Sequence, residues 1–184
     1  KWATMTAEQR AAQVAAAHDA VRGMTRTEGD LERRALGKQR TQAHATDDER
    51  RIARWLARHD IETTLQRAVG KYNVDVAADP VAVELFGGGW HAHGDHRARL
   101  PQRTRDVADH GWNTLIVWTH KVHRLGPKVT DELVAYVERS RSDPSFRRQY
   151  RVVWGDGKLI ASGSVDDDEI TLVPTGIRGT YGRP

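Results

Sequence analysis

The sequence predicts an α/β fold in which a central mixed sheet is flanked by helices, with an N-terminal helical arm and a C-terminal β-hairpin extension. Three observations predict it. Two short apolar segments, 71–76 and 81–86, are joined by a turn at Asp79-Pro80 and indicate a hairpin. An unbroken apolar run at 115–118 indicates a strand that is covered on both faces. Segments with apolar residues at helical spacing precede and follow these strands.

Length and composition limit the class of protein. The 184 residues suffice for one domain with a substantial core plus an appendage. No apolar run approaches membrane-spanning length and no secretory signal is visible, so we expect a cytoplasmic protein without a membrane partner. The net charge of +4 and the pI near 9.6 favour a polyanionic partner, although many soluble proteins share this balance. Lys1 in place of methionine suggests a trimmed or incomplete chain.

Residues 1–45 predict a helical arm that does not fold as a domain by itself. Residues 6–9 match a capping box that starts an alanine-rich helix ending near Ala20. Residues 25–28 could cap a second helix that ends near Arg40. Large apolar side chains are too scarce to offset the entropy of folding. We therefore expect the basic arm either to lean on the main domain or to contact DNA.

The main domain is expected over residues 46–143. Its first helix begins at Thr46 and places one face toward the core: Ile52, Trp55, Leu56 and His59. Residues 61–64 predict a short edge strand that precedes the hairpin. The basic segment 97–110 is expected to be helical or partly looped, and a helix is predicted over 130–141.

Residues 144–184 are expected to form the C-terminal extension. Two short strands, 150–154 and 158–162, flank Gly155-Asp156-Gly157, which is typical of a β-hairpin turn. The acidic run 166–169 favours a solvated loop over a metal site, because consecutive acids in a loop do not converge by themselves.

Two carboxylates within apolar strands are the strongest chemical signal. Asp75 lies between valines, and Glu84 lies between Val83 and Leu85. A carboxylate in such a strand is unfavourable unless it is paired or bound to a metal. Neighbouring strands can place the two groups together, and carboxylate oxygens suit Mg²⁺, which phosphodiester hydrolysis can use. The alternative is that both side chains alternate outward to solvent.

His91 follows three glycines and Trp90, an arrangement in which backbone and imidazole can both approach a substrate. A histidine there can act as acid or base near neutral pH. The nearby His93 and His96 leave a histidine-only zinc site as a competing idea, although their spacing matches no strong zinc pattern. The chain has no cysteine, so thiolate metal sites are excluded. Four arginines could bind DNA phosphates or form a solvated helix face: Arg97, Arg99, Arg103 and Arg105.

These motifs together resemble a known family. Asn73-Val74-Asp75, the segment from Glu84 to His91, and Gly111-Trp112 before the apolar strand resemble the very-short-patch-repair branch of PD-(D/E)XK nucleases. Within that branch, the sequence is most similar to the homing-endonuclease subgroup named for its Glu, Asp, His, Asp signature. The resemblance covers about residues 46–140.

The resemblance implies a restriction-endonuclease-like fold and magnesium-dependent cleavage of double-stranded DNA in a bacterial or phage-infected cell. By position, Asp75 would be the central metal ligand, with the main-chain carbonyl of Leu85 beside it. Glu84 is the candidate second ligand. His91 would activate or position the attacking water.

Two acids outside the hairpin are further candidates. Glu49 would be the helix glutamate that supports the site, although a capping box from Thr46 to Glu49 explains the same residue. Asp106 is a weaker candidate for the last acid of the signature, because its separation from Gly111-Trp112 is uncertain.

Two departures from the family pattern define the alternatives. Phe86 replaces the lysine of the Glu-x-Lys motif, so we expect His91 to take over its role. The absent zinc-binding cysteines argue against mismatch repair. The leading hypothesis is a homing-type DNA endonuclease. The alternatives are an inactive DNA-binding module on a nuclease-derived fold and a mismatch-nicking repair endonuclease.

Overall fold

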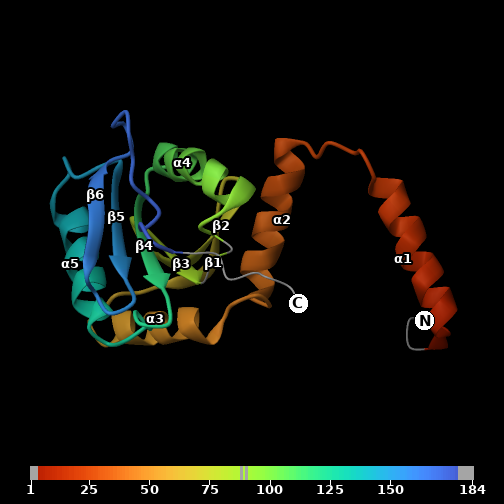
Figure 1. The fold of residues 1–184 in the computed structure, drawn as a ribbon, viewed down its shortest axis with the longest axis horizontal. Helices are drawn as coiled ribbons and strands as arrows, with labels where there is room; N and C mark the ends of the chain where they lie inside the picture. The colour runs from red at the N-terminus through yellow and green to blue at the C-terminus, as the bar shows by residue number, and fades with distance from the viewer. Residues whose placement is uncertain (1–3, 88, 90, 178–184) are drawn as a thin grey trace.

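The computed structural model describes residues 4–87, 89 and 91–177 (Figure 1). Gly88 and Trp90 of the glycine motif lie outside the described residues. The helices are α1 (Ala7–Val21), α2 (Glu28–Thr41), α3 (Asp47–Ala57), α4 (Gly94–Asp109) and α5 (Val129–Ser142). The strands are β1 (Thr64–Val69), β2 (Tyr72–Ala78), β3 (Val81–Gly87), β4 (Asn113–Thr119), β5 (Gln149–Trp154) and β6 (Leu159–Ser164).

The six strands form one mixed sheet in the order β1-β2-β3-β4-β5-β6. The pairs β1–β2 and β2–β3 are antiparallel, β3, β4 and β5 are parallel, and β6 returns antiparallel to β5. Helices α4 and α5 connect the parallel strands, as parallel pairing requires a long crossover. The predicted fold class, an α/β fold with a central mixed sheet flanked by helices, is confirmed, and the arrangement is consistent with a restriction-endonuclease-like fold.

One face of the sheet is covered by α3 and α5 (Figure 1). Ile52 and Leu56 of α3 and Leu133 of α5 are fully buried there against strand residues such as Val83. The predicted inward face of α3 is therefore correct for these residues. His59 is a correction: it follows the end of α3 and is exposed, because the helix stops at Ala57.

The other face is covered by α4 and by the segment that follows β6. Leu100 of α4 packs in the same cluster as Trp118 and Leu172, and the indole of Trp118 donates to the carbonyl of Leu172 at 2.9 Å. The predicted C-terminal hairpin is present as β5 and β6. It continues the main sheet, since Val152 and Val153 are buried in the cores of the two faces. Residues after 143 thus help to build the central domain.

The two helices of the predicted arm differ. Helix α2 packs against β1 and β2, where Ala35 is buried and the Gln39 side chain accepts the main-chain N–H of Ala68 at 2.8 Å. Helix α1 has no buried residue and stands apart from the body (Figure 1). The expectation that the arm packs against the main domain is therefore correct for α2 and not for α1.

Hydroxyl side chains cap the first helices. Thr6 and Gln9 form both halves of the predicted capping box. The cap of α2 is Thr27, which pairs with Asp30 rather than using the predicted box at 25–28, because Asp30 supplies the acid three residues later.

The edge strand predicted at 61–64 is wrong, since β1 begins at Thr64. The main-chain N–H of Ile61 donates back to the carbonyl of Leu56 at 3.2 Å, so this segment closes the end of α3. Among the helices of the described residues, none has the length and apolarity needed to cross a membrane.

Candidate functional site

Three predicted acids converge beside the sheet: Asp75 on β2, Glu84 on β3 and Glu49 in the first turn of α3. Glu49 and Glu84 are only 4% and 5% exposed. Burial first, and then the negative charges of Glu84 and Glu49, raise the pKa of Asp75 to about 8. The three carboxylates are therefore close enough to repel one another, and solvent does not screen that repulsion well.

The hairpin brings Asp75 and Glu84 to the same end of the β2–β3 pair. The ladder runs from Ala78–Val81 to Val76–Val83 and ends one residue before the two acids. Asp75 then receives the main-chain N–H of Leu85 on its Oδ2 atom at 2.8 Å. The alternative in which both acids alternate outward to solvent is excluded.

Glu49 does more than cap its helix. The hydroxyl of Thr46 accepts the Glu49 N–H at 3.2 Å and donates to Glu49 Oε1 at 3.0 Å. The other carboxylate oxygen, Oε2, accepts the amide of Gln66 at 2.7 Å. Glu49 therefore links the start of α3 to β1 and faces the same cluster as Asp75.

Gln66 is a site residue that sequence reasoning missed. Its Nε2 atom donates to Glu49 and lies 3.5 Å from Asp75 Oδ1, so one amide bridges two acids. Gln66 is 7% exposed and has a φ of 52°, a left-handed conformation that is rare for a residue other than glycine. Such strain is often found at functional positions. The only signal in the sequence is one amide between Leu65 and Arg67.

Arg103 belongs to the site, which corrects its predicted role as a DNA contact. Its guanidinium donates to Glu84 Oε1 at 2.5 Å and to the carbonyl of Asn73 at 2.8 Å, and lies 5.0 Å from the ring centre of Tyr72. Burial raises the pKa of Glu84, and the charge of Arg103 offsets only part of that effect.

The other predicted arginines separate into two groups. Arg97 and Arg99 lie on the surface, where Arg99 pairs with Asp95 at 3.3 Å and is 81% exposed. Arg105 donates to the carbonyl of Val165 at 3.0 Å and is tied to the C-terminal segment. The expectation of a solvated helix face is therefore correct for Arg97 and Arg99 at the start of the basic segment, and not for Arg103 and Arg105.

Asp106 lies outside the carboxylate cluster. It accepts the Tyr72 hydroxyl at 2.8 Å and pairs with Lys71 at 3.3 Å. Burial opposes ionisation, but hydrogen bonds from Gln102, Tyr72 and Lys71 outweigh it, so the pKa of Asp106 lies below its ordinary value. The structure therefore places Asp106 beside the Tyr72 hydroxyl, in a network that also includes Lys71 and Gln102.

His91 lies at the edge of the cluster. Its ring stacks on Phe86 with centroids 4.5 Å apart and contacts His96 edge to face at 5.9 Å. Burial, followed by the charges of His96 and Arg103, lowers the pKa of His91 below its usual range. A neutral imidazole at pH 7 can accept a proton, as a general base must.

A divalent cation fits this donor set. In the described part of the chain, no three His, Asp or Glu side chains are arranged as a metal site, which gives the histidine-only zinc idea no support. Mg²⁺, however, commonly takes one or two carboxylates and fills its remaining positions with water. Asp75 and Glu84 meet that requirement, and the Leu85 main chain is held beside Asp75 through its N–H. A bound cation would favour the ionised forms of Asp75 and Glu84, whose pKa values burial raises in its absence.

A shallow cavity of about 240 Å³ lies elsewhere, at the end of the sheet where β2 passes into β3. Its lining includes Arg67, Asp79 and Trp112 but none of the clustered carboxylates.

Comparisons with models of protein families, with curated proteins and with solved structures found no match to this chain.

Proposed function

We propose that this protein is a divalent-metal-dependent DNA endonuclease of the very-short-patch-repair-like PD-(D/E)XK type, similar to homing endonucleases. The observation that carries the proposal is the convergence of Asp75, Glu84 and Glu49 on one poorly screened site. A divalent cation would stabilise the ionised forms of these acids, and the acids sit on the elements that the sequence resemblance assigns to a nuclease site.

Each residue of the site has a role in phosphodiester hydrolysis. Asp75 and Glu84, with the Leu85 carbonyl, would hold Mg²⁺, which supplies neutralisation of the charge that develops on the phosphate. His91 is neutral and can take the proton of the attacking water. The Gln66 amide bridges Asp75 and Glu49 and would hold both side chains in place.

Arg103 can supply the positive charge that is lost at Phe86, the position at which the family has lysine. A guanidinium from α4 reaches the same pair of strands and interacts with both Glu84 and Asp75. Arg103, rather than His91, is therefore the residue that supplies the missing positive charge. His91 keeps the role of base.

Plasmid cleavage in Mg²⁺ tests the proposal. Asp75→Ala and His91→Ala should each abolish or strongly reduce cleavage, while Asp168→Ala, which removes an exposed acid, should not. Full activity in both site variants would exclude this mechanism.

The second candidate is an inactive DNA-binding module on a nuclease-derived fold. The Arg103–Glu84 pair favours it, because one expected metal ligand is already bound to a cation. This candidate predicts that the wild-type protein binds duplex DNA and leaves it intact at every Mg²⁺ concentration. A mismatch-nicking enzyme would instead prefer mismatched duplexes to intact ones.

A further inference from the structure

We propose that the turn after β4 is a DNA-docking surface that places the duplex against the site. This turn, here called the β4 turn, comprises residues 120–128, and the proposal rests on the proposed function in taking DNA as the substrate. It also adds to the predicted DNA surface, from which the structure removes Arg103 by binding it to Glu84.

The β4 turn is held in one conformation. The main chains of His120 and His123 pair through hydrogen bonds of 3.1 and 3.0 Å, so Lys121 and Val122 form a two-residue tip. The His123 ring stacks on Trp154 with centroids 4.3 Å apart, and its Nδ1 atom lies 2.8 Å from Asp156.

The Gly155-Asp156-Gly157 turn forms the seat beneath it. A Cβ atom at Gly155 would lie 2.8 Å from the carbonyl oxygen of His123, and one at Gly157 would lie 2.9 Å from that of Lys128. Gly155 also accepts the main-chain N–H of Gly126 at 2.9 Å. The glycines that predict the β5–β6 hairpin therefore also permit close contact with the β4 turn.

The exposed part of the β4 turn suits a polyanion. Four cations project there, and none of them forms an ion pair with a described residue: Lys121, Arg124, Lys128 and, from the seat, Lys158. The nearby acid, Asp156, is occupied by His123. Val122 is 78% exposed at the tip and offers an apolar contact within this positive surface. Regularly spaced phosphates are the partner that such charges match best.

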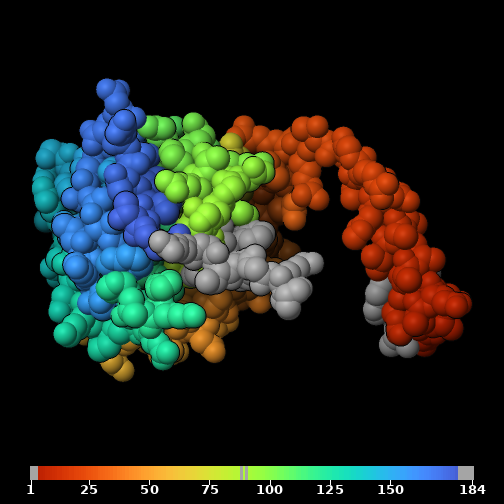
Figure 2. Space-filling view, in the orientation of Figure 1, coloured from red at the N-terminus to blue at the C-terminus, as the bar shows by residue number. Residues whose placement is uncertain are grey.

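The position of the β4 turn links it to the site. Strands β3 and β4 are parallel, with Gly87 opposite Thr119, and the Thr119 hydroxyl donates to the carbonyl of Phe86 at 3.3 Å. Glu84 lies three residues before Gly87, which is about 10 Å along a strand. That distance equals about three base pairs of duplex. Figure 2 shows the β4 turn (teal-green) and the start of α4 (yellow-green) on the same face of the molecule.

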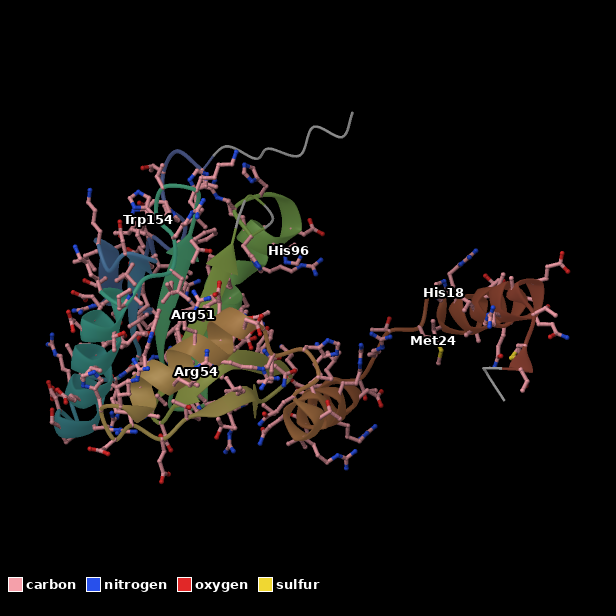
Figure 3. The ribbon with its side chains drawn as sticks, turned by 90° about the horizontal axis from the view of Figure 1, so that it is seen from below. His18, Met24, Arg51, Arg54, His96 and Trp154 are labelled. Atoms are coloured by element: carbon pink, nitrogen blue, oxygen red, sulfur yellow. The ribbon has the colours of Figure 1, made fainter. Side chains whose placement is uncertain are left out.

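DNA binding without divalent cation tests this proposal, measured by fluorescence anisotropy with a labelled random-sequence duplex. Lys121→Glu/Arg124→Glu should weaken binding about tenfold or more at about 0.1 M salt and reduce the slope of log K against log salt by about 1.8, since each lost phosphate contact contributes about 0.9. The matched control is Arg54→Glu/Arg58→Glu, which changes the same charge around the end of α3, where Figure 3 shows Arg54. It should have a much smaller effect on both quantities.

The neutral pair Lys121→Gln/Arg124→Gln separates a lost contact from a folding defect. It should show the same reduction in slope with an unchanged melting temperature. Equal effects of the β4-turn and control variants, with wild-type binding and cleavage intact, would overturn the docking surface and leave the nuclease proposal standing. Failure of the wild-type protein to bind duplex DNA would overturn both.

Discussion

Replacing Arg103 with methionine should destabilise the metal-free protein through Glu84. The side chain of Glu84 is 6% exposed and accepts the Arg103 guanidinium at 2.5 Å, so the variant leaves a buried carboxylate without its counter-charge. Breaking a buried pair by removing one partner costs about 3–5 kcal/mol, and the 28% exposure of the Arg103 side chain favours the lower limit. For a chain of this size, about 3 kcal/mol corresponds to a melting temperature lower by about 6–12 °C.

Differential scanning fluorimetry with EDTA measures this effect, and Arg99→Met is the matched control because it removes an exposed pair on the same helix. Two changes should restore the stability of Arg103→Met: a second substitution and added Mg²⁺. The double variant Arg103→Met/Glu84→Gln should melt above the single variant, since it removes the orphaned charge. Mg²⁺ should raise the melting temperature of Arg103→Met more than that of the wild type. A single variant that melts like the control would refute the pairing, and an equal Mg²⁺ response would refute Glu84 as a ligand.

Three further predictions follow from the site and the β4 turn. Because the folded-state pKa of Asp75 is raised to about 8, the folded protein holds a proton that the unfolded chain loses near pH 4, so metal-free stability should fall as pH rises from about 4 to 8. Asp75→Asn should flatten the melting temperature measured across that window, and an unchanged slope would contradict the burial of this charge. Gln66→Leu should lower stability by about 1.5–3 kcal/mol in urea unfolding, because two acids lose their shared donor, whereas Arg67→Ala on the exposed side should change it little. Gly155→Ala should destabilise by about 1–3 kcal/mol through its contact with the His123 carbonyl, whereas Gly37→Ala, with open space around it in α2, should stabilise by about 0.5–1 kcal/mol; the opposite order would show that the β4 turn is not seated as described.

The sequence predicts Asp75 and Glu84 well because a hairpin converts local spacing into spatial contact. Once the turn at Asp79-Pro80 sets the register, both acids lie one residue beyond the Val76–Val83 pair, at the same end of the two strands. Glu49 was ambiguous for a physical reason: a capping residue and a site residue need the same spacing from Thr46, and only the contact with β1 separates the two roles.

The inward position of Arg103 is predictable from helical periodicity. It lies three residues after Leu100 and four before Val107, both buried, so helical periodicity places it on the apolar face of α4. A basic run suggested a solvated surface instead. Gln66 had no comparable signal, since its contacts depend on a left-handed φ inside a strand, which no local pattern of side chains specifies.

The packing of α2 also decides where the chain can be shortened. Gln39 satisfies a main-chain donor on β1, the strand at one border of the sheet, and Ala35 is buried beside it. Removing residues 1–45 would therefore uncover an unpaired strand edge, which invites pairing between molecules and aggregation. A truncation that ends before Thr27 removes α1 alone and keeps this border covered. Only the shorter truncation can test whether the first helix contributes to the proposed DNA binding.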